Sequence, residues 1–221
     1  MQLALFDLDH TLIGFDSGMA WTRHLVRAGA LDRNAEERYL AFCHQYVAGT
    51  LDIHAMHRAS MAPLAAFAST QLRACQASFE REIVAQLSPA MLDLVAHHRD
   101  RGDLCALVTA TSRWVAQPFA RAFGIEHLLA TEAVAIDGVP TGEIDGLPCY
   151  SEHKLTRVRD WLAARTDRRR ALSDFEASWF YSDSVRDLPL LQAVSHPVAV
   201  RPDARLLTHA LASGWRIVEV N

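Results

Sequence analysis

Short apolar runs that end at polar residues constrain the fold of this 221-residue chain more than any other feature. Four such runs occur, at residues 3–6, 104–108, 179–181 and 197–200. Runs of this length are typical of buried parallel strands. Amphipathic stretches with helical spacing lie between them, at residues 90–101, 114–123, 155–165 and 189–194. Strands that alternate with helices predict an α/β fold, with a Rossmann-like parallel sheet and crossover helices.

One stretch breaks this alternation. Residues 16–88 have a helical pattern almost throughout, and the first strand ends just before them. A connection this long should form a small helical module of its own. It would lie above the carboxyl edge of the sheet, where α/β proteins bind ligands. We therefore predict a core domain of residues 1–15 and 89–221 and an inserted helical cap domain of residues 16–88. Residues 133–148, with two Asp-Gly pairs, predict a small hairpin.

Composition excludes several classes of protein. The net charge of −4 and the lack of a basic stripe argue against a nucleic-acid binder, and the Arg168–Arg170 cluster is expected to be a solvated helix end. No apolar run is long enough for a membrane helix, and Asp7 and Asp9 interrupt the N-terminal stretch, so we expect no signal peptide. Four widely spaced cysteines without a CxxC pair indicate reduced thiols in the cytoplasm. The expected partner is a small molecule, and the expected state a monomer or homodimer.

Polar side chains collect where the predicted strands end. They are, in chain order, Asp7, Asp9, Thr11, Thr109, Asp183 and Asp187, with Lys154 at the start of a helix. In a parallel sheet these ends share one edge, so the side chains can converge. Several carboxylates repel one another and need a cation, and oxygen ligands suit Mg²⁺. A carboxylate can attack phosphorus, an ammonium can hold the transferring oxygens, and a second carboxyl can protonate the leaving alcohol and then deprotonate water.

This set of motifs closely resembles that of the haloacid dehalogenase (HAD) superfamily. The motifs are Asp7-x-Asp9-x-Thr11, Thr109, Lys154 and Asp183-x-x-x-Asp187, in that order. The resemblance covers the whole chain and is to subfamily IB, the phosphoserine-phosphatase-like branch, which carries its helical cap between the first two motifs. It implies the HAD fold and hydrolysis of phosphoric monoesters. Dehalogenases of the superfamily lack the acid that matches Asp9, so its presence favours phosphate chemistry.

The resemblance also implies how the acidic residues act. Asp7 is expected to be the nucleophile that forms an aspartyl-phosphate, and also a ligand of Mg²⁺. Asp9 is expected to be the general acid and base, with its backbone carbonyl on the metal. Asp183 would ligate Mg²⁺ directly. Asp187 would act through water or by holding Lys154 in place.

The same resemblance assigns the remaining motif residues. Thr109 and Lys154 would hold the phosphoryl oxygens, and Thr11 would support the loop through hydrogen bonds. Phosphoserine phosphatases often carry a glycine-rich stretch after the hydroxyl that matches Thr109. Here Ala110 and Thr111 follow, so their side chains change the room near the substrate, and phosphoserine itself is in doubt.

Three residues are candidates for substrate binding: Asp16, Ala110 and Arg58. Asp16 matches the acidic residue that receives the substrate amine in phosphoserine phosphatases, although it could equally cap the first helix of the cap domain. Arg58 could bind a carboxylate, but no motif anchors it. A small amine-bearing phosphate such as histidinol phosphate or phosphoserine is therefore expected. Six cap residues could line a pocket for a ring or form the core of the cap: Trp21, Phe42, His44, Tyr46, His54 and His57.

Other functions remain open from the sequence. A phosphotransferase would use the same aspartyl-phosphate, and a non-catalytic regulatory protein could bind the same phosphometabolite. A signalling receiver domain uses similar residues but needs neither the long insertion nor a second acid. The basic residues add one more observation, because 21 are Arg and only Lys154 is Lys. A compact ammonium and a planar guanidinium are not interchangeable. We expect amine reagents to modify Lys154 and the N-terminus only.

Overall fold

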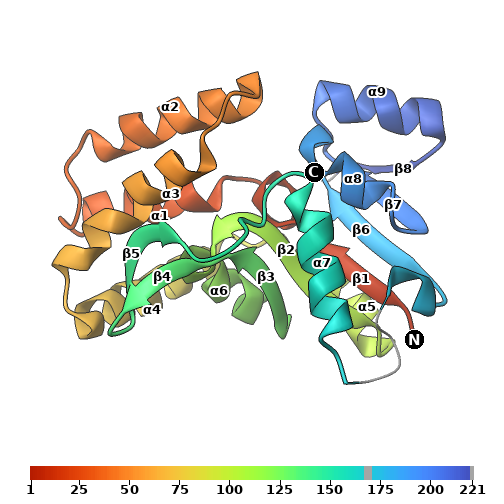
Figure 1. The fold of residues 1–221 in the computed structure, drawn as a ribbon, viewed down its shortest axis with the longest axis horizontal. Helices are drawn as coiled ribbons and strands as arrows, with labels where there is room; N and C mark the ends of the chain where they lie inside the picture. The colour runs from red at the N-terminus through yellow and green to blue at the C-terminus, as the bar shows by residue number, and fades with distance from the viewer. Residues whose placement is uncertain (167–170, 220–221) are drawn as a thin grey trace.

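A computed structural model describes residues 1–166 and 171–219 of the chain. Within them, six parallel strands form one sheet in the order β3-β2-β1-β6-β7-β8 (Figure 1). The strands are β1 (Leu3–Phe6), β2 (Leu104–Ser112), β3 (His127–Thr131), β6 (Ser178–Ser182), β7 (His196–Val200) and β8 (Arg216–Val218). The expected α/β fold is thus confirmed. The expected basic helix end at Arg168–Arg170 lies outside the described residues.

Helices cover both faces of the sheet. They are α5 (Pro89–Asp100), α6 (Arg113–Ala122), α7 (His153–Ala163), α8 (Leu188–Leu191) and α9 (Ala204–Ser213). Alternate residues of β1 point to opposite faces of the sheet. Phe6 packs in the core beneath α5 and α6, whereas Leu5 packs beneath α7, α8 and α9. This alternation is the ordinary side-chain geometry of a strand, and it buries β1 on both faces.

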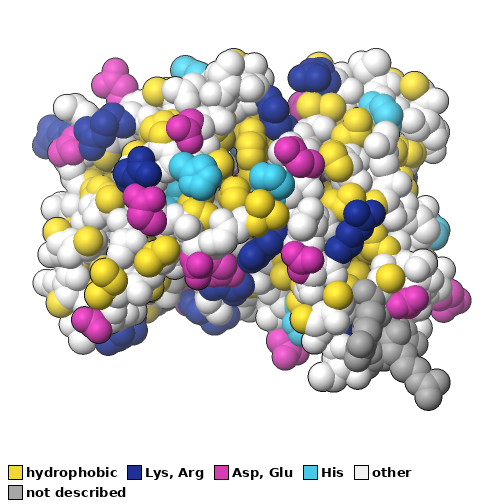
Figure 2. All heavy atoms as spheres, in the orientation of Figure 1, with side chains coloured by type: hydrophobic (Ala, Val, Ile, Leu, Met, Phe, Trp, Pro, Cys, Tyr) yellow, Lys and Arg dark blue, Asp and Glu magenta, His cyan; other side chains and the backbone are white. Residues whose placement is uncertain are grey.

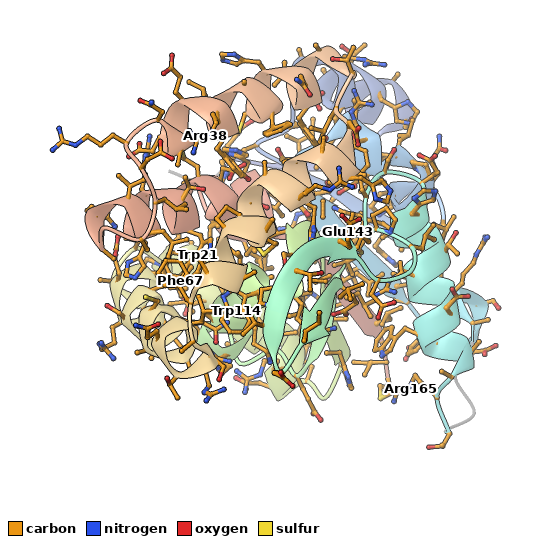
Figure 3. All side chains as sticks on the ribbon, turned by 60° about the vertical axis from the view of Figure 1, so that its left-hand side comes forward. Trp21, Arg38, Phe67, Trp114, Glu143 and Arg165 are labelled. Carbon is orange, nitrogen blue, oxygen red and sulfur yellow. The ribbon has the colours of Figure 1, made fainter. Side chains whose placement is uncertain are left out.

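A helical segment of residues 17–84 follows β1 and lies to one side of the sheet (Figure 1). Its helices are α1 (Ser17–Arg27), α2 (Ala35–Ala48), α3 (Ile53–Met61) and α4 (Ser69–Val84). Its core is continuous with that of the sheet, because Phe79 of α4 meets Phe119 of α6 edge-on at 5.8 Å between ring centroids. Trp21, Phe67 and Trp114 lie close together at this junction (Figure 3). The division into two domains stays a prediction.

The expected hairpin consists of β4 (Ala133–Ile136) and β5 (Val139–Ile144). Its turn is Asp137-Gly138, and both residues have positive φ angles, 51° and 78°. The hairpin packs against α3: the His57 ring nitrogen Nδ1 lies 2.9 Å from the Gly142 carbonyl oxygen. Beside it, Arg58 Nε lies 2.8 Å from Glu143 (Figure 3 labels Glu143). Any side chain at position 142 would collide with Ala62, because a Cβ atom on Gly142 would lie 2.9 Å from the Ala62 Cβ.

Two findings bear on the setting of the protein. The four cysteines, all within the described residues, are free thiols, as expected. Among the helices of the described ranges, none is long and apolar enough to cross a bilayer.

Candidate active site

Asp7 and Lys154 form the centre of the candidate site. Asp7 follows β1 directly, and Lys154 lies in the first turn of α7. The Lys154 ammonium donates to Asp7 Oδ1 and to Asp187 Oδ2, both at 2.7 Å, and only 4% of its surface is exposed. Burial alone would lower the pKa of Lys154, but the charges of Asp187 and Asp7 outweigh it and hold that pKa well above its usual range. Lys154 is therefore a fixed cation between two carboxylates.

Asp187 holds the lysine from the other side. Its Oδ2 atom also accepts a hydrogen bond from the Ser182 hydroxyl at 2.7 Å. Burial raises the pKa of Asp187 to about 6 even though Lys154 opposes the shift. Of the two roles expected for Asp187, the geometry therefore has it holding Lys154 directly.

Thr11 joins Asp7 to Asp183. The Thr11 hydroxyl oxygen lies 3.1 Å from Asp7 Oδ2 and 3.3 Å from Asp183 Oδ1, and it accepts the Asp183 N–H at 3.0 Å. Two carboxylates thus converge on one hydroxyl group. Burial, followed by the charges of Asp7 and Asp187, raises the pKa of Asp183 to about 8. This is the behaviour of like charges that share a poorly solvated site.

The donor set fits a hard divalent cation. Mg²⁺ is commonly bound by one or two carboxylates and completes its shell with water and phosphate oxygens. Asp7 and Asp183 offer two converging carboxylate groups, and a cation between them would offset their repulsion. The part of the chain that the structure describes holds no group of three or more His, Cys, Asp or Glu side chains placed to bind a metal. The remaining ligands would therefore be backbone carbonyl, water or substrate oxygens.

Asp9 is held by two other elements. It lies in a tight turn in which His10 adopts a φ of 57°. The Ser17 N–H donates to Asp9 Oδ1 at 2.5 Å, and the Thr111 hydroxyl donates to Asp9 Oδ2 at 2.7 Å. Burial, followed by the charge of Asp16, raises the pKa of Asp9. A carboxyl with a raised pKa retains its proton closer to neutral pH, as a general acid requires.

A cleft of about 620 Å³ opens above these carboxylates, between the sheet and helices α1, α2 and α3. The helical wall is largely apolar, and its lining includes Met19, Tyr39, Phe42, Cys43, Tyr46 and Met56. On the face shown in Figure 2, hydrophobic side chains gather along the seam between the helical segment and the sheet core. The cleft therefore combines an acidic floor with an apolar and aromatic wall.

The helical wall also experiences negative charge. Burial, followed by the charges of Asp16 and Asp9, raises the pKa of Tyr39 well above its usual range. The same causes raise the pKa of Cys43 to about 12, so this residue is a neutral thiol. Burial disfavours a charge of either sign, whereas the charges of Asp9 and Asp16 favour a cation beside them. Arg23, Arg186 and Arg205 also line the cleft.

Comparison with known proteins identifies the family. The profile of the haloacid dehalogenase-like hydrolases matches residues 4–192. The chain belongs to this family. It is 38% identical, over 224 aligned residues and 98% of both chains, to a histidinol-phosphatase of Neisseria meningitidis. A crystal structure of a protein of unknown function from Bordetella pertussis matches with a TM-score of 0.89 and 42% identity, over 98% of this chain and 97% of that one.

A third comparison concerns the fold alone. A phosphoserine phosphatase, in a structure of a phospho-aspartyl intermediate analogue, matches this HAD hydrolase with a TM-score of 0.61 and 15% identity, over 97% and 91% of the two chains. The expected membership of the phosphoserine-phosphatase-like HAD branch is confirmed, and the chain is a phosphoric monoester hydrolase.

Hydrogen bonds join five of the HAD motif residues, namely Asp7, Thr11, Lys154, Asp183 and Asp187. Asp9 lines the same cleft, but Thr109 does not, and the candidate substrate residues divide as well. Asp16 lines the cleft and also caps α1, since its Oδ1 accepts the Met19 N–H at 2.7 Å. Ala110 lines the cleft as well. Arg58 does not line it, because its exposed guanidinium pairs with Glu143 on the hairpin. Thr109 is fully buried, and its hydroxyl oxygen accepts the Thr111 N–H at 3.1 Å.

Six cap residues were expected either to line a pocket for a ring or to form the core of the cap. Some of them do the first and some the second. Phe42 and Tyr46 line the cleft. Trp21 is in the hydrophobic core, and His57 is buried against the hairpin. The remaining two, His44 and His54, are exposed and lie outside the cleft lining.

Sequence reasoning missed the role of Arg201 and the contact that Tyr46 makes with the loop after β6. Arg201 lies just after β7, and its guanidinium donates to the carbonyls of His10 and Thr11, at 3.1 and 2.6 Å, which fixes the loop after β1. Tyr46 of α2 meets the Asp183 loop, with its hydroxyl 2.9 Å from Ser184 Oγ. Arg201 could have been noticed, because it too is a polar residue at a strand end. A contact like that of Tyr46 depends on helix orientation and leaves no local signal.

Proposed function

We propose that this HAD hydrolase is a Mg²⁺-dependent phosphatase that acts through a phosphorylated Asp7, on a small amine-bearing metabolite. The observation that carries the proposal is the position of Asp7 at the floor of the cleft. One of its oxygens faces the Lys154 ammonium at 2.7 Å, and the other faces Asp183 across Thr11. A carboxylate so held is oriented for attack, and the group around it can neutralise a phosphoryl group.

The proposed reaction has two steps. Asp7 attacks phosphorus in line, and as the bond to the leaving oxygen breaks, Asp9 gives that oxygen a proton. Asp9 then takes a proton from water, which attacks the phosphorus of phospho-Asp7 and releases inorganic phosphate. Lys154 and the Thr109 hydroxyl hold phosphoryl oxygens during both steps. Mg²⁺, held by Asp7, Asp183 and the Asp9 carbonyl, would supply further positive charge at the phosphoryl oxygens.

The cleft favours a leaving group that carries an amine and a ring. The negative field of Asp9 and Asp16 at Tyr39 suits an ammonium, and Phe42 and Tyr46 offer apolar and aromatic surface to a ring. Arg58, the residue considered for a substrate carboxylate, is outside the cleft. Of the arginines that line it, Arg23 pairs with Glu36 and Arg186 packs on the Tyr46 ring, and Arg205 is the third. Together with the similarity to a histidinol-phosphatase, these observations support histidinol phosphate ahead of phosphoserine. The free thiols support a cytoplasmic setting.

The test is a screen of small phosphate esters with Mg²⁺, compared by kcat/KM and including histidinol phosphate and phosphoserine. We expect histidinol phosphate to have the highest value and Asp7→Asn to abolish turnover. Asp145→Asn makes the same change at an exposed turn and should leave activity intact. Full Mg²⁺-dependent activity in Asp7→Asn would refute the mechanism, and a preference for phosphoserine would refute the substrate. Inorganic phosphate should appear in equal amount with and without an added alcohol, whereas a phosphotransferase would phosphorylate the alcohol.

Asp16→Asn tests amine recognition separately. Asn is as good a helix cap as Asp, so the variant keeps the acceptor for Met19 and loses only the charge. We expect KM for histidinol phosphate to rise about tenfold or more, because a hydrogen bond to a charged group contributes about 1.5–3 kcal/mol. KM for its deamino analogue should stay unchanged. An equal rise for both esters would show that Asp16 does not select the amine.

A further inference from the structure

The carboxyl group of Asp9 is fixed by donors from two separate elements. Ser17 begins α1 and donates its N–H to Oδ1, and Thr111, near the end of β2, donates its hydroxyl to Oδ2. Each donor takes one carboxyl oxygen, so together they set the plane of the group. One donor alone would leave the carboxyl free to rotate. The remaining lone pairs of Asp9 stay available toward the cleft, which Asp9 and Thr111 both line.

The Ser17 and Thr111 side chains also contact each other. Their hydroxyl oxygens lie 3.0 Å apart. A hydroxyl group has one proton and two acceptor sites, and Thr111 gives its proton to Asp9, so Ser17 must donate to Thr111. When Asp9 carries its proton on the side that faces the cleft, Oδ2 still has a lone pair that accepts from Thr111, so the direction of these hydrogen bonds is unchanged. The pair therefore serves Asp9 both as carboxylate and as acid without moving any heavy atom.

The backbone of Thr111 is fixed as well. Its N–H donates to the Thr109 hydroxyl oxygen at 3.1 Å, and a β-branched residue in a strand has restricted χ1 freedom. Thr111 thus contacts both the residue expected to hold the phosphoryl group and the residue expected to protonate the leaving oxygen. None of the motif residues duplicates these contacts.

We propose that Thr111 is a positioning residue that aims the Asp9 carboxyl at the leaving oxygen, with Ser17 as its hydrogen-bond partner. This inference rests on the proposed function, since it assumes that Asp9 is the general acid. It gives the Thr111 hydroxyl a role in phosphoryl transfer from esters whose alcohols need a proton to leave. Where the leaving group departs as an anion and needs no proton, the proposal predicts no contribution from the Thr111 hydroxyl.

Two esters and two substitutions test this inference. Thr111→Val keeps the shape and removes the hydroxyl, whereas Thr111→Ser keeps the hydroxyl and removes a methyl group. The measured quantity is kcat/KM, which reports phosphoryl transfer to Asp7 and excludes the later hydrolysis step. For the alkyl ester histidinol phosphate, we expect Thr111→Val to lose roughly 10- to 100-fold, part of the 10²–10⁴-fold that a general acid contributes. For p-nitrophenyl phosphate we expect little change, and Thr111→Ser should stay near the wild type with both esters.

The controls separate this inference from the proposed function. Thr208→Val makes the same change on an exposed face of α9 and should alter neither value. Thr111→Ala is a second variant without the hydroxyl, for use if the valine variant does not fold. Equal losses with both esters in a folded variant, or no loss with the alkyl ester, would overturn the role of Thr111. If the wild-type enzyme hydrolyses neither ester, the proposed function itself fails.

Discussion

Lys154 shows how far one residue can be understood from the sequence. As the sole lysine among 22 basic residues, it was expected beside phosphate and carboxylates. The structure places its ammonium 2.7 Å from both Asp7 and Asp187. The expectation that amine reagents would reach it is revised, because Lys154 is buried and its two carboxylates hold its pKa well above the usual range. A neutral, accessible amine is what such reagents require.

The buried lysine predicts a labelling pattern. In the native protein we expect an amine reagent near neutral pH to modify the N-terminus alone. After denaturation, Lys154 should react as well, because unfolding removes both the burial and the carboxylates. Intact-mass spectrometry counts the labels, and Lys154→Arg is the control that should gain no second label. Labelling of native Lys154 at the rate seen in denaturant would contradict the buried ion pairs.

At the scale of elements, the contact between α3 and the hairpin rests on His57. A carbonyl oxygen can only accept, so His57 must donate from Nδ1 to Gly142. Its Nε2 is then unprotonated, and it is buried with no hydrogen-bond partner among the described residues. Burial lowers the pKa of His57 from 6.5. The neutral ring is therefore the form that fits this junction.

This junction should weaken in acid. Below pH 6.5 the unfolded chain takes up a proton on His57 that the native protein resists, so the contribution to stability is complete above pH 6.5 and falls as the pH falls. His57→Asn keeps a donor for Gly142 and removes the titration. We expect Tm to fall less between pH 7 and pH 5 in this variant than in the wild type. His44→Asn, at an exposed position of α2, should follow the wild type. Parallel curves for His57→Asn and the wild type would refute the assignment.

The strands differ in how well the sequence predicted them. The four predicted strands form β1, β2, β6 and β7, because buried strands carry continuous apolar runs. The outer strands β3 and β8 were missed. Only three residues long, β8 (Arg216–Val218) has partly exposed side chains, and β3 (His127–Thr131) merges with the apolar residues before the hairpin. Pairing with a neighbour defines both outer strands, and pairing is not a local property of the sequence.

At the scale of the whole molecule, topology made the catalytic floor predictable. A parallel sheet brings its carboxyl ends to one edge, so Thr11 after β1 meets Asp183 after β6 although 172 positions separate them. The cleft wall was less predictable, because it depends on how helices orient against the sheet. The sequence alone did not reveal that Arg58 would turn toward the hairpin or that Thr111 would reach Asp9. The direction of a side chain on such a helix depends on how the helix packs, so it can be read only from the tertiary structure.

The balance of charge at the floor predicts how the molecule responds to metal. Lys154 contacts Asp7 and Asp187, and Asp183 lies beside Asp7 across Thr11. Without a cation, burial and the charges of Asp7 and Asp187 raise the pKa of Asp183 to about 8, so ionising this carboxyl in the native protein is unfavourable. Mg²⁺ that binds only the native state at 100 times its Kd should stabilise by about 2.7 kcal/mol. For a chain of this size each kcal/mol shifts Tm by about 2–4 °C. We therefore expect Mg²⁺ to raise Tm by roughly 5–10 °C.

Asp183→Asn separates this effect from nonspecific stabilisation by salt. The variant removes one repelling carboxylate, so its metal-free Tm should exceed that of the wild type. It also removes a proposed ligand, so most of the Mg²⁺ shift should disappear. Asp145→Asn, at an exposed position outside the cleft lining, should keep both wild-type values. Thermal unfolding with and without Mg²⁺ measures the metal-free Tm and the Mg²⁺ shift of each protein. An undiminished shift in Asp183→Asn would place the cation elsewhere in the molecule.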